Sequence, residues 1–133
     1  MREQEFSASL DFLQDVISFV EQELESAGCP LRTIMQISVA VEEVFANIAS
    51  YAFPGSVGRA LIRIEAEEHK AVIRFTDSGI PFNPLEKDDP DVTLPAEQRE
   101  IGGLGIFMVK KTMDEVLYQR DGQKNILTIM KRY

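Results

Sequence analysis

The spacing of apolar residues changes from a helical period to a strand period partway along the chain, and this change most constrains the fold. Two helical stripes come first, separated by the helix breakers Gly28 and Pro30. The stripes are formed by Leu10, Leu13, Ile17, Val20 and Leu24, and then by Ile34, Ile37, Val41, Val44 and Ile48. Alternating apolar and polar residues follow at 60–66 and 71–76, which is typical of two strands joined as a hairpin.

Further elements are predicted at both ends of the chain. A short extended segment surrounds residues 4–6, a short helix follows the glycines at 102–105, and two strands are expected near 116–119 and 126–131. Successive helices beside hairpin strands favour an α+β fold, a two-layer α/β sandwich with the helices on one face of a mixed, mostly antiparallel sheet. We expect one domain over residues 1–133.

Composition narrows the possible classes of protein. The 133 residues are 44% hydrophobic, enough for a buried core, and the N-terminus lacks the apolar run of a signal peptide, so a cytoplasmic protein is expected. A net charge of −8 disfavours nucleic-acid backbones and anionic membranes as partners. With one cysteine, Cys29, and one histidine, His69, no internal disulfide and no His/Cys metal site are expected.

The segment from Ile80 to Ile101 has neither a helical nor a strand period. It contains four prolines with acidic residues between them. A loop of this length inside a small domain is more often a functional lid or a disordered segment than a plain connection. We therefore predict a lid over residues 80–101.

Glu43 and Asn47 stand four residues apart on the second predicted helix, so their side chains share one face at the edge of the apolar stripe. Glu42 is expected to point away from the core. A carboxylate that accepts a proton and an amide oxygen that binds a hard cation are suited to phosphoryl transfer beside Mg²⁺. Taken alone, this spacing more often marks a solvated helix edge.

Two glycine-containing turns add separate signals. Asp77-Ser78-Gly79 directly follows a predicted strand, where a carboxylate could accept a hydrogen bond from an exocyclic amine and a glycine keeps the backbone close to a flat ring. On its own it is first of all a turn. Gly102 to Gly105 precedes a predicted helix and could present backbone N–H groups to a phosphate, or could serve as a hinge.

Together, these signals resemble the Bergerat-fold ATPases, also called GHKL or histidine-kinase-like ATPases, over nearly the whole chain. The stretches at residues 41–47, 77–84 and 103–106 are most similar to those of the anti-sigma-factor serine/threonine kinases. The resemblance implies Glu43 as catalytic base and Asn47 as Mg²⁺ ligand. It also implies that Asp77 reads adenine with Gly79 beneath the base, and that Gly103, Leu104 and Gly105 surround the phosphates.

The resemblance further implies ATP and Mg²⁺ as cofactors and a protein kinase that acts in trans. Its expected partners are a sigma factor and an anti-anti-sigma antagonist protein, which it would phosphorylate on Ser or Thr, and family members commonly form homodimers. The alternative is a non-catalytic, ATP-dependent protein-binding module. Two departures bear on phosphate contacts: Tyr51 stands where the family often has His, and the second glycine run lacks a basic residue, the nearest being Arg99.

Overall fold

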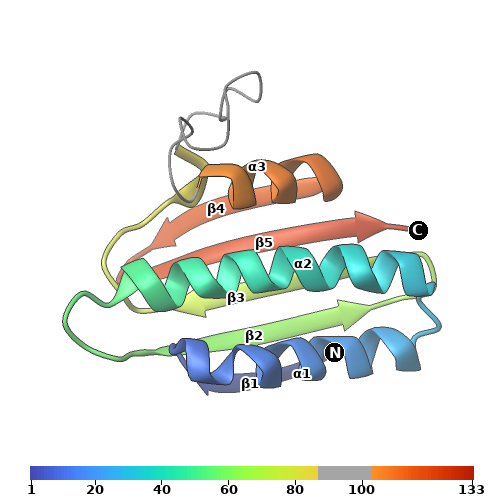
Figure 1. Cartoon of the computed structure of the whole chain (residues 1–133), viewed down its shortest axis with the longest axis horizontal. Helices are drawn as coiled ribbons and strands as arrows, with labels where there is room; N and C mark the ends of the chain where they lie inside the picture. Colours follow the sequence, from blue (N-terminus) through green and yellow to red (C-terminus); the bar gives the residue numbers. More distant parts are fainter. Residues whose placement is uncertain (87–102) are drawn as a thin grey trace.

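The computed structural model describes residues 1–86 and 103–133 as a two-layer arrangement of helices on a sheet (Figure 1). The strands are β1 (Arg2–Ser7), β2 (Arg59–Ala66), β3 (Lys70–Asp77), β4 (Glu115–Asp121) and β5 (Lys124–Arg132), and the α-helices are α1 (Leu13–Ser26), α2 (Leu31–Asn47) and α3 (Gly103–Thr112). Three shorter helical turns are η1 (Leu10–Phe12), η2 (Ile48–Ala52) and η3 (Pro84–Glu86). Most of the predicted lid, residues 87–101, lies outside the described residues.

The described strands form one sheet in the order β1-β2-β3-β5-β4. Every neighbouring pair is antiparallel, where the sequence had predicted a mixed, mostly antiparallel sheet. The reason is that α1 and α2 are two helices in succession, so β2 begins at the end of the sheet where β1 ended and runs back beside it. β3 and β4 do point the same way, but β5 lies between them.

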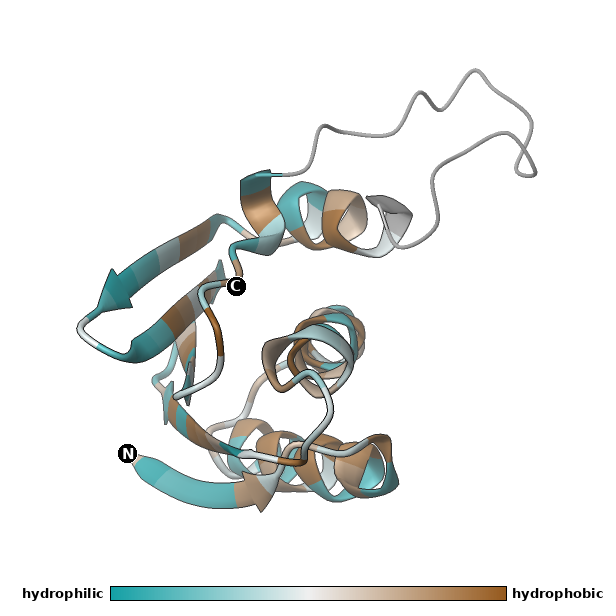
Figure 2. Ribbon diagram, turned by 90° about the vertical axis from the view of Figure 1, so that its left-hand side faces the viewer, coloured by the Kyte–Doolittle hydropathy of each residue, from teal (hydrophilic) through white to brown (hydrophobic). Residues whose placement is uncertain are grey.

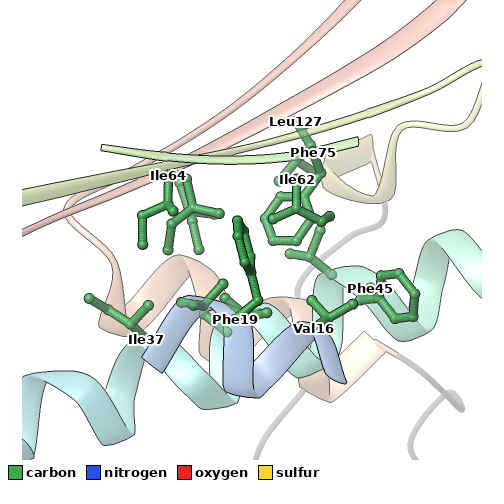
Figure 3. Close-up of a cluster of buried hydrophobic side chains, with 14 of the residues drawn as sticks. Val16, Phe19, Ile37, Phe45, Ile62, Ile64, Phe75 and Leu127 are labelled. Carbon is green, nitrogen blue, oxygen red and sulfur yellow. The ribbon is translucent and has the colours of Figure 1, made fainter. Parts of the chain in front are cut away.

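All three helices cover the same face of the sheet, as Figure 2 shows from the side. This confirms the predicted two-layer α+β sandwich. The core fills the space between the two layers, where side chains of α1 and α2 meet those of β2, β3 and β5 (Figure 3). Within the described residues, no helix is long and apolar enough to span a membrane.

The buried stripe of α2 agrees with the prediction, whereas the buried stripe of α1 is rotated about the helix axis relative to the predicted one. Leu10, predicted to be buried, is 56% exposed. It lies in η1, a 3₁₀ turn capped by Ser9, whose hydroxyl oxygen accepts a hydrogen bond from the Asp11 amide at 3.3 Å. The α-helix therefore starts only at Leu13, and its buried residues are Val16, Phe19, Val20 and Leu24.

Ile37 and Met35 offer a matched test of this packing, because both lie on α2 with exposures of 1% and 62%. Ile37→Ala should lower the free energy of unfolding by about 2–5 kcal/mol, since it leaves a cavity against the sheet. Met35→Ala should change it by less than about 0.5 kcal/mol. Urea unfolding measures both, and equal losses would contradict the described orientation of α2.

Candidate functional site

A small cavity lies beneath the C-terminal end of α2, between that helix and β3, β4 and β5. It encloses about 20 Å³, room for about one water molecule. Its walls are mainly apolar, and its polar lining groups come from Asn47, Asp77, Tyr118 and Asn125. The apolar lining residues are Val44, Ile48, Ala52, Phe75, Phe82, Pro84 and Leu127. An apolar pocket with a few convergent polar groups is the usual form of a small-molecule site.

Asp77, at the end of β3, is the acidic group of this cavity and is only 4% exposed. Its Oδ1 accepts hydrogen bonds from the Gly79 amide at 2.9 Å and from Asn125 Nδ2 at 3.0 Å. No buried side-chain N or O atom in the described part of the chain lacks a partner. Oδ2 accepts no hydrogen bond from the described residues, and Asp77 lines the cavity.

Gly79 lets the turn after β3 pass very close to η2. The Ile80 amide donates to the Ala52 carbonyl oxygen at 2.9 Å, and a Cβ atom at Gly79 would overlap that same oxygen. Only glycine fits here without a backbone shift. η2 takes part because it is a π-turn that continues directly from α2 and brings Ala52 beside the turn.

Glu43 and Asn47 lie at the edge of the buried stripe of α2, as the spacing predicts. Glu42 is exposed and Glu43 is half-buried. Asn47 Nδ2 donates to the Glu43 carbonyl oxygen at 2.8 Å. The Asn47 side-chain oxygen accepts no hydrogen bond from the described residues, so it can bind a ligand. Asn47 lines the same cavity as Asp77.

The Glu43 carboxylate lies against Gly105, in the first turn of α3, which begins at Gly103. A Cβ atom at Gly105 would overlap Glu43 Oε2. Burial raises the pKa of Glu43 above its ordinary value, and the negative charge of Glu42 raises it further. The free N–H groups of a helix start are suited to bind an anion, so a carboxylate and an anion-binding helix end face each other here.

Three polar residues near Asp77 were missed by the sequence reasoning: Tyr118, Arg120 and Asn125. Asn125 is 4% exposed and pairs with Asp77 across β3 and β5. A signal for Asn125 was present, because it shares the strand face of the buried Leu127 and Ile129, where an unpaired polar residue would be costly. Tyr118 and Arg120 lie on an edge strand and carry no such signal.

Tyr51, which stands where the resembling family often has His, lies next to the cavity. Its ring stacks on that of Phe82, with centroids 5.2 Å apart and an interplanar angle of 29°. Phe82 itself lines the cavity. The two rings therefore form an aromatic wall, which we define as Tyr51 and Phe82.

The fold defines a structural class, because it is similar to that of solved histidine kinases. The solved histidine kinase domain of the blue-light activated histidine kinase of Erythrobacter litoralis EL346 aligns with a TM-score of 0.59 at 16% identity. The alignment covers 90% of this chain and 60% of that chain, so this chain spans less than two thirds of the solved structure. Acinetobacter baumannii histidine kinase AdeS aligns with a TM-score of 0.52 at 16% identity, over 99% of this chain and 68% of that one.

Sequence comparison gives the family. The profile of the histidine kinase-like ATPase domain matches residues 6–131, and the chain belongs to this family, which implies that it binds ATP. It is 32% identical over 108 residues to the serine-protein kinase RsbW of Listeria monocytogenes serovar 1/2a, covering 77% of this chain and 69% of that protein. RsbW of Bacillus cereus strain AH820 is 27% identical over 104 residues, covering 75% and 64%.

The raised pKa of Glu43 predicts a pH-dependent cost to stability. The folded protein holds this proton more tightly than the unfolded chain, whose Glu43 has an ordinary pKa near 4.5, so the ionised carboxylate destabilises the fold above its raised pKa. Glu43→Gln should therefore be more stable than the parent at neutral pH, and the difference should shrink as the pH falls toward 4.5.

Urea unfolding from about pH 4 to about pH 8 measures this difference. Glu68→Gln is the control, because it makes the same change at a side chain that is 88% exposed. A Glu43→Gln protein with the parent's stability at every pH would show that burial does not disfavour the Glu43 charge.

Proposed function

We propose that this domain binds Mg-ATP and transfers the terminal phosphoryl group to a serine or threonine of a protein antagonist. The observation that carries the proposal is the Asp77 carboxylate at an apolar cavity that Asn47 also lines, with Glu43 four residues before Asn47 on α2 and against the first turn of α3. The same region therefore provides a carboxylate that can accept a hydrogen bond from adenine and an amide oxygen that can bind the metal ion. It also provides a carboxylate that can serve as general base and the N-terminus of a helix.

The cavity has the chemistry of an adenine site. Its apolar walls suit a flat ring, and the free Asp77 oxygen can accept a hydrogen bond from the exocyclic amine of adenine. Guanine presents a carbonyl at the corresponding position and would repel the carboxylate. The enclosed 20 Å³ is smaller than a purine, so binding requires the aromatic wall of Tyr51 and Phe82 to move outward.

The phosphates would extend from the cavity toward α3, where Gly103, Leu104 and Gly105 form the first helical turn. Asn47 supplies one amide oxygen, which suits Mg²⁺, a metal that commonly takes one or two protein ligands together with phosphate oxygens and water. A bound magnesium ion would neutralise charge on those phosphates. A glycine at 105 leaves room for the Glu43 carboxylate at this helix start.

Glu43 is proposed as the general base. Its carboxylate would take the proton from the acceptor hydroxyl while that oxygen bonds to the terminal phosphorus and the bond to the bridging oxygen of ADP breaks. A pKa raised by burial makes Glu43 a stronger base than a solvated glutamate. The family resemblance also implies that Gly79 lies beneath the adenine ring.

The proposed partners follow from the relatives and from the resemblance to anti-sigma-factor kinases. The similar proteins of Listeria and Bacillus are serine-protein kinases. We propose that this chain acts in the cytoplasm as an anti-sigma regulatory factor, binding a sigma factor and phosphorylating an anti-anti-sigma antagonist, and that it works as a homodimer. The predicted lid over residues 80–101 is retained as part of this proposal.

Asp77→Asn tests adenine recognition. An amide can turn its NH₂ toward the donor of the base, so the variant should lose a charge-assisted hydrogen bond of about 1.5–3 kcal/mol, about 10-fold to 100-fold in ATP affinity. Calorimetric titration with Mg-ATP measures this loss, and the parent should bind GTP poorly. Equal ATP and GTP binding by the parent, or unchanged ATP affinity in the variant, would remove Asp77 from this role.

Glu43→Ala and Asn47→Ala separate chemistry from binding. Glu43→Ala should slow phosphoryl transfer about 10²–10⁴-fold with ATP affinity nearly intact, because a general base acts mainly when the hydroxyl loses its proton. Asn47→Ala should instead weaken Mg²⁺-dependent ATP binding and leave metal-free binding nearly unchanged. Transfer of labelled phosphate to the antagonist measures the first effect and calorimetry the second. Undiminished transfer by Glu43→Ala would favour the ATP-dependent binding module.

A further inference from the structure

We infer that Asn125 is a positioning residue that fixes the orientation of the Asp77 carboxylate and holds the adjoining wall of the cavity. The inference rests on the proposed adenine site, which it deepens. Asn125 lies on β5, 48 residues after Asp77, and reaches it only because the two residues pair across the sheet. It is one of three buried polar or charged residues among those described.

Both the nitrogen and the oxygen of the Asn125 side-chain amide are hydrogen-bonded. Nδ2 donates to Asp77 Oδ1 at 3.0 Å and to the Ile80 carbonyl oxygen at 2.8 Å. Oδ1 accepts from the Phe82 amide at 3.3 Å, from Arg120 Nη1 at 3.2 Å and from the Tyr118 hydroxyl. Turning the amide over would set its oxygen against two acceptors and its nitrogen against the N–H donors of Phe82 and Arg120, so one orientation is strongly preferred.

This orientation determines what Asp77 can offer a ligand. Asn125 and the Gly79 amide both donate to Oδ1, so that oxygen is occupied and the carboxylate cannot rotate freely. Oδ2 has no donor among the described residues, and Asp77 lines the cavity. Without Asn125, the Gly79 amide would be the one remaining described donor to the carboxylate, so the acceptor for the base would be less firmly placed.

Asn125 also secures the segment that forms one side of the cavity. It holds Ile80 through the carbonyl and Phe82 through the amide, while Arg120 Nη1 donates to the Gly79 carbonyl oxygen at 2.9 Å. The backbone of residues 79–82 is thereby tied to β4 and β5. Since Phe82 stacks on Tyr51, the same contacts set the resting position of the aromatic wall.

Only an amide satisfies all of these neighbours. An aspartate at 125 would place a second carboxylate against Asp77, and a leucine would leave Asp77, Ile80 and Phe82 without their partner. Asn125 therefore contacts both Asp77, which would distinguish adenine from other bases, and the backbone that forms one side of the cavity. Its effect should appear as a change in base preference and not only as a uniform loss of affinity.

Asn125→Ala tests the inference through the ratio of ATP to inosine triphosphate affinity, measured by calorimetry on the full chain. Inosine triphosphate carries a carbonyl where ATP has its exocyclic amine, so the ratio reports the Asp77 contact. We expect the parent to favour ATP about 10-fold to 100-fold and Asn125→Ala to lower that ratio about tenfold. Thr128→Ala, on the same strand but the opposite face, should keep the parent ratio.

Tyr118→Phe is a milder second variant, because it keeps the ring at the cavity and removes one hydrogen bond that orients Asn125. It should lower the ratio about threefold, and it decides the question if Asn125→Ala does not fold. An unchanged ratio in folded Asn125→Ala, or in Tyr118→Phe when Asn125→Ala does not fold, would overturn the inference. A parent that binds both nucleotides equally, or neither, would instead overturn the proposed adenine site.

Discussion

The buried hydrogen bond between Asp77 and Asn125 is the interaction on which the candidate site depends. It joins the ends of β3 and β5, the strands at the centre of the site, and links them to the turn after β3. A buried carboxylate is costly unless it is hydrogen-bonded. Here two donors on one oxygen offset that cost, and the carboxylate lines the cavity. The same arrangement therefore supports the fold and presents an acceptor to a ligand.

Two close backbone approaches bring the separate parts of the site together. At Gly79 the turn after β3 meets η2, and at Gly105 the start of α3 meets the carboxylate of Glu43. Neither contact has room for a side chain without movement of its neighbour. α2 connects the two places, because its apolar stripe packs on the sheet while its edge carries Glu43 and Asn47.

Much of the fold could be predicted from local patterns, and the exceptions have local causes. The apolar stripe of α2 and the hairpin of β2 and β3 follow directly from residue spacing. The α1 stripe was wrong at Leu10 because Ser9 caps a 3₁₀ turn before the helix, which changes the helical phase. The sheet was expected to be mixed and mostly antiparallel, and paired helices and hairpins make every neighbouring pair of described strands antiparallel.

The sequence by itself determined the elements, the family resemblance and the shared face of Glu43 and Asn47, because these depend on residues a few positions apart. Only the tertiary structure decided that Asn125 meets Asp77, that Tyr51 stacks on Phe82 and that Glu43 faces Gly105. These contacts join residues from separate elements, so they depend on strand register, on the π-turn after α2 and on how α3 packs against α2. Hydrophobic periodicity records which face of an element is buried, but not which residue of another element lies opposite.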